Sequence, residues 1–402
     1  MNLPRAIVLT GDVGMGHHVV TQVVAESLDE MGFRTDVLDC MALLGPVGAR
    51  AGDWLFRHMT ALPTLYDGVH FAHFRTGSRL ARAMDRAATA KLVPALTAEI
   101  GPAPVEVVVS TFATGASAIA KLPADLGHDR RPTTVALCTD ACPHSIWVDE
   151  ALDLFLVTSA AAAATVRRYA PHAAIAVVPA PVRSTFHEAP TQADARRELG
   201  LPPDARCALV MGGGWGLGPL AATASSLAAR GVVVLAVAGH NEQQARALAA
   251  VARRQPRVMP FGFTDQVPVL MAASDIVLTT PGATTCSEAR VVGRPLMLLD
   301  VMPGHGRDNV QHELELGEAD VCDPEPARLV DCVLGALERA APSARSRPAE
   351  DRFSDALADA LALVGVASRT HRRVAGYDPR AGCGWGGRLP TRSPAPTPEE
   401  VH

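Results

Sequence analysis

One stretch, residues 275–288, constrains the fold more than any other: an apolar run that ends in a Pro-Gly turn and continues as a helix. Residues 275–279 are apolar enough for a strand buried in a parallel sheet. Pro281 and Gly282 end that strand and allow a tight turn. A strand that passes through such a turn into a helix is typical of α/β folds, whose ligands bind at the carboxyl ends of the strands.

The helix that begins at Ala283 predicts a nucleotide site. Its first N–H groups together carry about half a positive charge, which favours a phosphate at the helix tip. Thr284, Thr285 and Ser287 add hydroxyl donors. Glu288 lies on the same face as Thr284, one turn on, where a carboxylate can accept two hydrogen bonds from a ribose diol. The Walker lysine is missing, so this is not a P-loop. An ordinary strand–helix connection with hydroxyl capping is the alternative.

Length and composition limit the classes of protein that this chain can represent. Its 402 residues, 48% of them apolar and 20% charged, are enough for two domains with cores of their own. A net charge of −5 excludes a large basic surface for nucleic acid. We expect neither a signal peptide nor a transmembrane segment. The eight cysteines include no Cys-x-x-Cys pair, so we expect reduced core residues, not a disulfide frame or a metal site.

A glycine-rich turn near the N-terminus predicts a second ligand-facing loop. A strand over 5–10 is followed by this turn at 11–18, a helix to about Met31 and a strand over 35–40, which together make a βαβ unit. The glycines have the spacing Gly-x-x-Gly-x-Gly. This spacing differs from the dinucleotide fingerprint and does not by itself indicate NAD or FAD.

His17 and Asp140 are the candidate proton acceptors. His17 lies beside the positive end of a helix, which disfavours its protonation and leaves a ring nitrogen that can accept a proton. A phosphate ligand, or an exposed residue at a helix start, is the alternative for His17. Asp140 follows the strand predicted over 133–139, at the carboxyl end where α/β proteins keep their chemistry. A capping carboxylate is the alternative for Asp140.

The second half repeats the pattern of the first. A strand over 206–211 leads into a glycine-rich turn at 212–218, where glycine permits close approach of the backbone to a ligand. Gly262 and Phe263 follow the strand predicted over 257–261, and a flat base can rest there. The other predicted strands are 105–110, 154–157, 175–178, 232–238, 295–299 and 319–322, and a long helix is predicted over 78–100.

Two Rossmann-like domains are therefore expected. A stiff Pro-rich connection around 179–183 divides an N-terminal domain, 1–182, from a C-terminal domain, 183–340. A linker and helix follow over 341–366, and the Gly/Pro/Arg-rich tail over 367–402 is expected to be disordered. Residues 49–77 interleave aromatic and basic side chains, which suits an anionic membrane surface, an acceptor pocket or a small structural core.

The motifs form an ordered set that resembles one family of enzymes. In order they are Gly14-Met15-Gly16-His17, Thr139-Asp140, His144-Ser145-Ile146-Trp147, Pro181-Val182-Arg183, Met211-Gly212-Gly213-Gly214, Gly262-Phe263, Pro281-Gly282, Ser287-Glu288 and Pro303-Gly304 with Asn309. Over about residues 5–340 this set resembles the GT-B glycosyltransferases of the monogalactosyldiacylglycerol synthase and processive diacylglycerol glucosyltransferase group, which is similar to glycosyltransferase family 28.

The resemblance implies a fold and a reaction. The fold is α/β, with two Rossmann-like parallel-sheet domains facing each other across a cleft. The reaction is an inverting, metal-independent transfer of a hexose from a UDP-sugar to a hydroxyl of a lipid or other hydrophobic acceptor, with no cofactor besides that co-substrate. His17 or Asp140 would be the catalytic base. We expect a cytoplasmic protein, or one peripheral on the inner face of the plasma membrane.

The resemblance also assigns residues to the two substrates. The acceptor would contact Gly14, Gly16, His144 and Trp147. The donor would contact Gly213, Gly214, Phe263, Pro281, Gly282, Ala283, Thr284, Thr285, Glu288, His305 and Asn309.

One position departs from the family pattern. Members usually carry Gln-Glu after the Pro-Gly of the 303 loop, where the donor sugar is read, and here His305 and Gly306 stand there. Neither galactose nor glucose is therefore assigned as the donor sugar. The alternatives are a transferase acting on a soluble natural product, a UDP-sugar epimerase and a non-catalytic nucleotide-sugar binder.

Overall fold

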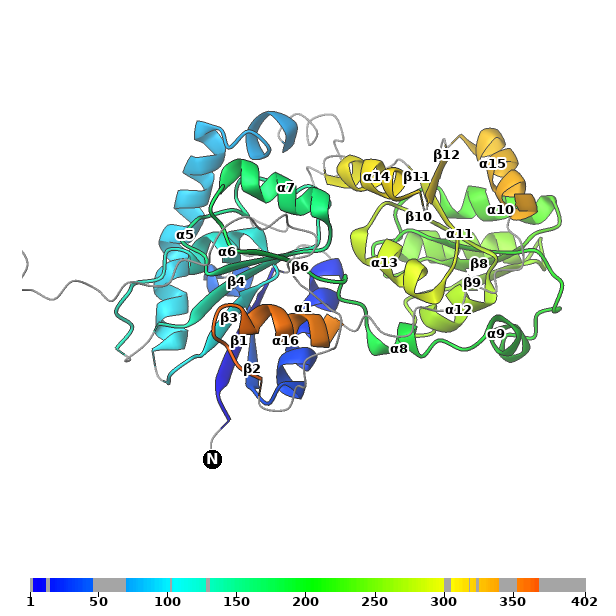
Figure 1. Cartoon of the computed structure of the whole chain (residues 1–402). Coiled ribbons are helices and arrows are strands. Elements are labelled where there is room, and N and C mark those ends of the chain that lie inside the picture. The colour runs from blue at the N-terminus through cyan, green and yellow to red at the C-terminus, as the bar shows by residue number, and fades with distance from the viewer. Residues whose placement is uncertain are drawn as a thin grey trace, which may run out of the picture.

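The chain forms two α/β domains, each built on a six-stranded parallel sheet (Figure 1). A computed structural model describes residues 3–11, 15–45, 70–101, 103–127, 131–299, 305–317, 319–322, 325–339 and 353–368.

The first sheet has the strand order β2-β1-β3-β4-β5-β6. Its strands are apolar on both faces and almost fully buried at its centre, because helices cover both sides. The strands are β1 (Arg5–Thr10), β2 (Arg34–Asp39), β3 (Val107–Ser110), β4 (Thr133–Cys138), β5 (Leu154–Val157) and β6 (Ile175–Val177).

Two hydrophobic cores flank the first sheet. One core packs α5 (Arg79–Ile100), α6 (Ala113–Ile119) and α7 (Ala160–Tyr169) against one face. The other packs α1 (Met15–Glu30) and α16 (Phe353–Ala362) against the opposite face. Helix α16 follows the second domain in sequence, yet it lies beside α1 (Figure 1). The first domain is therefore completed by the C-terminal helix of the described chain.

The second sheet has the strand order β12-β11-β10-β7-β8-β9. Its order reverses between β10 and β7, and this is the position where open parallel sheets bind their ligands. The strands are β7 (Cys207–Met211), β8 (Val233–Val237), β9 (Val258–Phe261), β10 (Ile276–Thr279), β11 (Leu296–Leu299) and β12 (Ala319–Cys322).

Helices cover both faces of the second sheet as well. One core contains α10 (Leu220–Ala229), α11 (Glu242–Ala252) and α15 (Pro326–Arg339). The other contains α8 (Ser184–His187), α9 (Gln192–Glu198), α12 (Val267–Ala273), α13 (Ala283–Val292) and α14 (His305–Leu316). Two short elements remain, α2 (Cys40–Leu43) and η1 (His70–Phe74).

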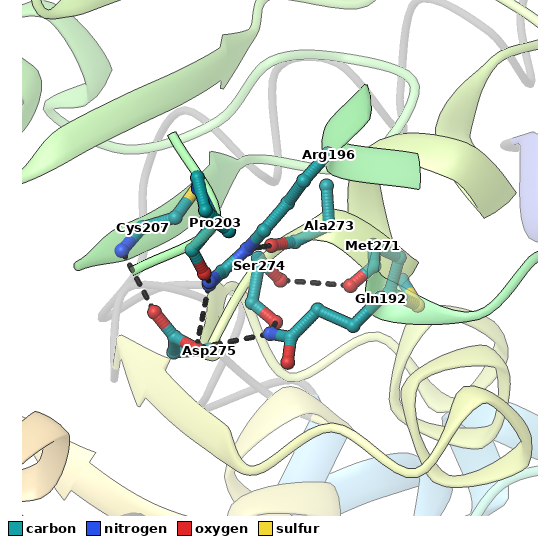
Figure 2. A network of polar contacts seen from close by, with 8 residues as sticks. All are labelled: Gln192, Arg196, Pro203, Cys207, Met271, Ala273, Ser274 and Asp275. Atoms are coloured by element: carbon teal, nitrogen blue, oxygen red, sulfur yellow. Dashed lines mark hydrogen bonds and ion pairs between the residues drawn. The ribbon is translucent and has the colours of Figure 1, made fainter. Parts of the chain in front are cut away.

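A polar network ties α9 to the amino ends of β7 and β10 (Figure 2). The carboxylate of Asp275 accepts hydrogen bonds from Arg196 at 2.8 Å, from Gln192 at 2.9 Å and from the backbone N–H of Cys207 at 2.9 Å. The buried Arg196 also donates to the carbonyl of Ala273 at 3.0 Å. The network lies at the edge of the sheet opposite the ligand edge, so its role is structural.

The predicted strands are all present, with ends that differ by at most two residues. Three predictions of element type are wrong. Cys40, predicted to end a strand, begins α2, because the carboxylate of Asp39 caps the backbone N–H of Met41 there. Residues 15–18, predicted in the glycine-rich turn, already belong to α1, and residues 305–309, predicted in a loop, belong to α14. The predicted C-terminal helix is present as α16. The predicted disordered tail beyond 368 and most of the aromatic segment, 49–69, lie outside the described residues.

Candidate active site

The starts of α1 and α13, one from each domain, meet between the two sheets. Gly16 in the first turn of α1 lies so close to Thr284 that a Cβ added at Gly16 would come within 3.3 Å of the Thr284 hydroxyl oxygen. Both helices follow the carboxyl end of a central strand, β1 in one case and β10 in the other. Gly14, also predicted here, lies outside the described residues.

The tip of α13 is built to receive an anion. Gly282 occupies the N-cap and has no side chain to accept from the N–H groups of the first turn. The space around the Gly282 Cα is open, whereas Pro281 is buried. Ala283 and Thr284 are half-buried and Thr285 is buried, so the first turn is only partly open to water. These positions, predicted to bind the donor phosphates, form one continuous backbone surface.

Glu288 lies one turn beyond this tip and is buried, with 4% of its surface exposed. Its Oε1 accepts a hydrogen bond of 3.1 Å from Arg183, in the connection between the domains. Arg183 also lies over the ring of Phe186, 4.9 Å from its centroid. Burial raises the pKa of the Glu288 carboxyl to about 7, although the charge of Arg183 opposes the change. The carboxylate predicted to bind a ribose is thus also joined to the interdomain connection.

The glycine-rich loop after β7 packs against the loop after β8. A Cβ added at Gly216 would lie 2.2 Å from the carbonyl oxygen of Ala238, and one at Gly239 would lie 2.4 Å from that of Gly214. Gly213, in contrast, has open space around its Cα and a left-handed φ of +63°. Gly213 and Gly214 are therefore at the ligand edge of the sheet, as predicted for residues that approach the donor diphosphate.

Phe263 has 60% of its surface exposed, at the same edge of the sheet. Its ring stacks on that of His240, with centroids 4.0 Å apart and planes inclined by 19°. The pair forms a flat aromatic surface beside the glycine-rich loop, since the backbone N–H of His240 donates to the carbonyl of Gly214 at 2.9 Å. His240 could not be predicted from the sequence, because Phe263, the residue on which it stacks, follows a different strand.

In the first domain, His17 has a defined orientation. Its Nδ1 lies 3.0 Å from the carbonyl oxygen of Thr111, and its ring meets that of Phe112 edge-on. A carbonyl only accepts, so Nδ1 carries the proton and the lone pair of the neutral ring is on Nε2. A neutral imidazole in this tautomer has its basic nitrogen at Nε2.

The other predicted residues of the first domain have different surroundings. Asp140 is half-buried beyond the end of β4. His144 is half-buried and packs against the rings of Phe74 and Trp147. Trp147 is only 3% exposed and belongs to the first hydrophobic core. Of the predicted acceptor residues that the structure describes, Gly16 is therefore exposed, His144 is half-buried and Trp147 is inaccessible.

Asn309, predicted to contact the donor, joins the two domains. Its Oδ1 accepts from the backbone N–H of Ala141 at 3.2 Å, and its Nδ2 donates to the carbonyl of Pro281 at 3.0 Å. Beside it, Asp308 pairs with Arg75 of the first domain at 2.6 Å. These partners are far apart in sequence, so local pattern gave no signal for them. The side chain of His305 lies outside the described residues.

Neither a metal cluster nor a membrane-spanning helix occurs in the part of the chain that the structure describes. No group of three His, Cys, Asp or Glu side chains gathers there in a way that suits a metal ion. None of the described helices combines the length and the apolar character needed to cross a bilayer.

Comparison with known proteins agrees with this geometry. Residues 209–322, which lie in the second domain, match the glycosyltransferase family 28 C-terminal domain. The chain is 34% identical over 148 residues to monogalactosyldiacylglycerol synthase 2 of Arabidopsis thaliana, which covers 34% of this chain and 31% of the relative. It is 27% identical over 192 residues to the processive diacylglycerol beta-glucosyltransferase of Bacillus licheniformis, covering 47% and 50%. The chain thus spans half or less of the length of these relatives.

Solved structures show the fold over a larger share of the chain. UGT2 of Phytolacca americana, complexed with UDP-2fluoro-glucose and pterostilbene, superposes with a TM-score of 0.55 at 14% identity, covering 83% of this chain and 90% of that one. MurG of Acinetobacter baumannii superposes with a TM-score of 0.51 at 14% identity, covering 84% and 92%. The chain therefore has the GT-B fold.

Proposed function

We propose that this chain, whose residues 209–322 match the glycosyltransferase family 28 C-terminal domain, transfers a hexose from a UDP-sugar to a hydroxyl of a lipid of the diacylglycerol type. The observation that carries the proposal is the uncapped tip of α13, which faces the start of α1 across the gap between the domains. The curated relatives named above are a monogalactosyldiacylglycerol synthase and a diacylglycerol glucosyltransferase, which supports a lipid acceptor.

The reaction in this proposal is a single displacement with inversion. The acceptor oxygen forms a bond to the anomeric carbon while the bond from that carbon to the β-phosphate oxygen of UDP breaks. The acceptor proton passes to Nε2 of His17, whose Nδ1–H is held by the carbonyl of Thr111. Asp140, beyond the end of β4, orients the acceptor hydroxyl.

The leaving UDP carries the negative charge that develops in the transition state. The N–H groups of residues 283–285 and the helix dipole place positive potential where that charge forms. They supply what a metal ion supplies in other transferases, and we therefore propose a reaction that needs neither metal nor cofactor. Gly213 and Gly214 approach the diphosphate, Phe263 supports the uracil ring, and Glu288 accepts from the ribose.

A lipid acceptor requires contact with a membrane surface, and α5 offers one. Leu80 and Met84 are 53% and 41% exposed and lie one turn apart on this helix. Exposed arginines at 79, 82 and 86 surround them, and basic residues beside apolar ones suit an anionic bilayer. The end of η1, which precedes α5 in the chain, is tied to the loop after Asp140, since the Ser145 hydroxyl donates to the carbonyl of Phe74 at 2.6 Å. We propose a cytoplasmic protein that binds the inner face of the plasma membrane at this surface.

A transfer assay tests the proposal. Purified full-length protein is mixed with UDP-galactose, UDP-glucose or UDP-N-acetylglucosamine and with vesicles that contain diacylglycerol and phosphatidylglycerol. We expect one donor to yield a glycolipid and an equal amount of UDP. Transfer only to soluble acceptors would show that the acceptor is a soluble small molecule and not a lipid. Sugar isomerisation without acceptor would indicate an epimerase, and no binding of UDP at millimolar concentration would refute the donor site.

A further inference from the structure

Asn309 makes a hydrogen-bonded bridge between the two domains. It is buried, with 4% of its surface exposed, in the first turns of α14. Its amide oxygen accepts from the N–H of Ala141, the residue after Asp140, a candidate proton acceptor. Its amide nitrogen donates to the carbonyl of Pro281, the residue before the N-cap of α13. One side chain thus binds the backbone next to Asp140 and the backbone next to the start of α13, the proposed phosphate site.

The helix that carries this bridge is anchored firmly to α13. Glu313, two turns after the start of α14, is buried and pairs with Arg290 of α13. Arg290 also donates to the hydroxyl of Ser287 at 3.1 Å. Because removing one partner of a buried ion pair leaves the other charge uncompensated, the Arg290–Glu313 pair links α14 to α13. A contact between α14 and the first domain therefore also positions α13 relative to that domain.

A second contact crosses the gap beside the bridge. Asp308 accepts from Arg75 at 2.6 Å, and both side chains are largely buried. The carbonyl of Arg75 in turn accepts from the hydroxyl of Tyr169 at the end of α7. Arg75 follows η1, whose Phe74 packs on His144. The pair and the Asn309 bridge thus join the acceptor side of the first domain to the donor side of the second.

We propose that Asn309 is a positioning residue for glycosyl transfer, not a contact for the donor sugar. The inference rests on the function proposed above. Asn309 spans the gap with one hydrogen bond to each side. It thereby sets how the loop that carries Asp140 lies relative to the start of α13, where the leaving UDP is proposed to bind. An amide suits this task, because its two ends bind one N–H and one C=O without adding a charge to a buried site. If the reacting groups of the two domains are misplaced by about 1 Å relative to each other, turnover can fall about a hundredfold.

Two measurements on Asn309→Ala test the inference. The first is hydrogen exchange at the Ala141 amide, read by mass spectrometry with fragmentation to single residues. We expect exchange there to accelerate at least about tenfold, while the amides of β4 keep their protection. The second is the separation of UDP binding from turnover. We expect kcat to fall about tenfold to a hundredfold, with the dissociation constant for UDP changed by less than about threefold.

Two further variants provide the controls. Gln311→Ala changes an exposed residue on the same helix and is expected to match the wild type in both measurements. Asn309→Asp keeps an oxygen that accepts from Ala141 but loses the donor to Pro281. It is expected to retain much of the protection at Ala141 and to recover part of the lost turnover. Matching protection of β4 in all variants shows that each one is folded.

The outcomes separate this inference from the proposed function. Unchanged exchange at Ala141 in Asn309→Ala would overturn the bridge, and lost protection with normal kcat would overturn the positioning role. A fall in UDP affinity as large as the fall in kcat would return Asn309 to the donor site. If the wild-type protein neither binds UDP nor transfers a hexose, the proposed function and the positioning role fall together, and the exchange at Ala141 still decides whether the bridge exists.

Discussion

Among single residues, Glu288 most directly connects stability, pH and the proposed ribose contact. It is buried beside Arg183, and its pKa is raised to about 7 from a reference value of 4.5. The folded protein therefore binds the Glu288 proton more tightly than the unfolded chain does. The stabilisation from that proton is complete below the unfolded pKa and is lost as the pH rises through the folded one.

We predict that Glu288→Gln weakens this pH dependence. From about pH 5 to about pH 8 the wild-type protein should lose up to about 3 kcal/mol more unfolding free energy than the variant, because a neutral amide does not titrate. Urea unfolding across this range measures the difference. UDP affinity should also fall in the variant, since an amide oxygen is a poorer acceptor for a ribose diol than a carboxylate. If the unfolding free energies of the two proteins changed equally with pH, the raised pKa of a buried Glu288 would be contradicted.

His17 is the second residue whose geometry leads to a prediction. Its tautomer is set by the carbonyl of Thr111, which leaves Nε2 as the acceptor. His17→Ala should lower kcat at least about a hundredfold, with UDP binding retained, because it removes the general base. His18, its exposed neighbour in the same helix turn, provides the matched control, and His18→Ala should keep near-normal turnover. Equal losses in the two variants would point to damage to α1, not to lost chemistry.

Among the elements, the glycine-rich loop after β7 shows how two similar residues differ in their constraints. Gly216 and Gly213 both have a left-handed φ, +57° and +63°. Only at Gly216 would a Cβ meet backbone, the carbonyl oxygen of Ala238 at 2.2 Å. A side chain at Gly213 would project into open space at the ligand edge.

The paired substitutions to alanine should therefore separate stability from binding. Gly213→Ala is expected to cost about 1–2 kcal/mol of unfolding free energy, the cost of a left-handed L-residue, and to weaken UDP binding by blocking the approach of the diphosphate. Gly216→Ala should cost more than about 3 kcal/mol, because the loop must move away from β8. Thermal unfolding and UDP titration of both variants measure the two effects. A smaller loss of stability in Gly216→Ala than in Gly213→Ala would be inconsistent with this packing.

Sequence patterns predicted the elements well, because buried parallel strands are nearly continuous apolar runs between turn residues. The strand–turn–helix from 275 to 288 was predicted in detail, since each step has a local signal. Local signals are also why the tip of α13 and His17 could be predicted. Asn309 could not be understood in this way, because its two partners, Ala141 and Pro281, are brought to it only by the docking of the domains. The same reason hides Arg75. The stacking of His240 on Phe263 and the pairing of Arg183 with Glu288 are hidden because packing within the second domain brings together residues that are distant in sequence.

In the whole molecule, polar side-chain contacts between described residues cross the gap between the two domains. The Arg75–Asp308 pair is one of them, with side chains 26% and 16% exposed. The pair joins the two domains beside Asn309, so we expect its effect on turnover to act through the arrangement of the domains.

A double-mutant cycle over Arg75 and Asp308 should reveal this coupling. Each single substitution to alanine is expected to lower kcat several-fold, and the double variant to lose little more than either one, which gives a coupling of about 1–2 kcal/mol. The exchange of charges, Arg75→Asp with Asp308→Arg, should restore part of the loss. Steady-state kinetics with saturating UDP-sugar measures each step of the cycle. Additive single effects would mean that the pair does not act across the gap.

The account depends most directly on where a diphosphate binds, and a crystal structure of the protein with UDP measures this. The account predicts the β-phosphate within hydrogen-bonding distance of the backbone N–H groups of residues 283–285, the ribose at Glu288 and the uracil against Phe263. A UDP molecule bound elsewhere, or phosphates turned away from the start of α1, would contradict it.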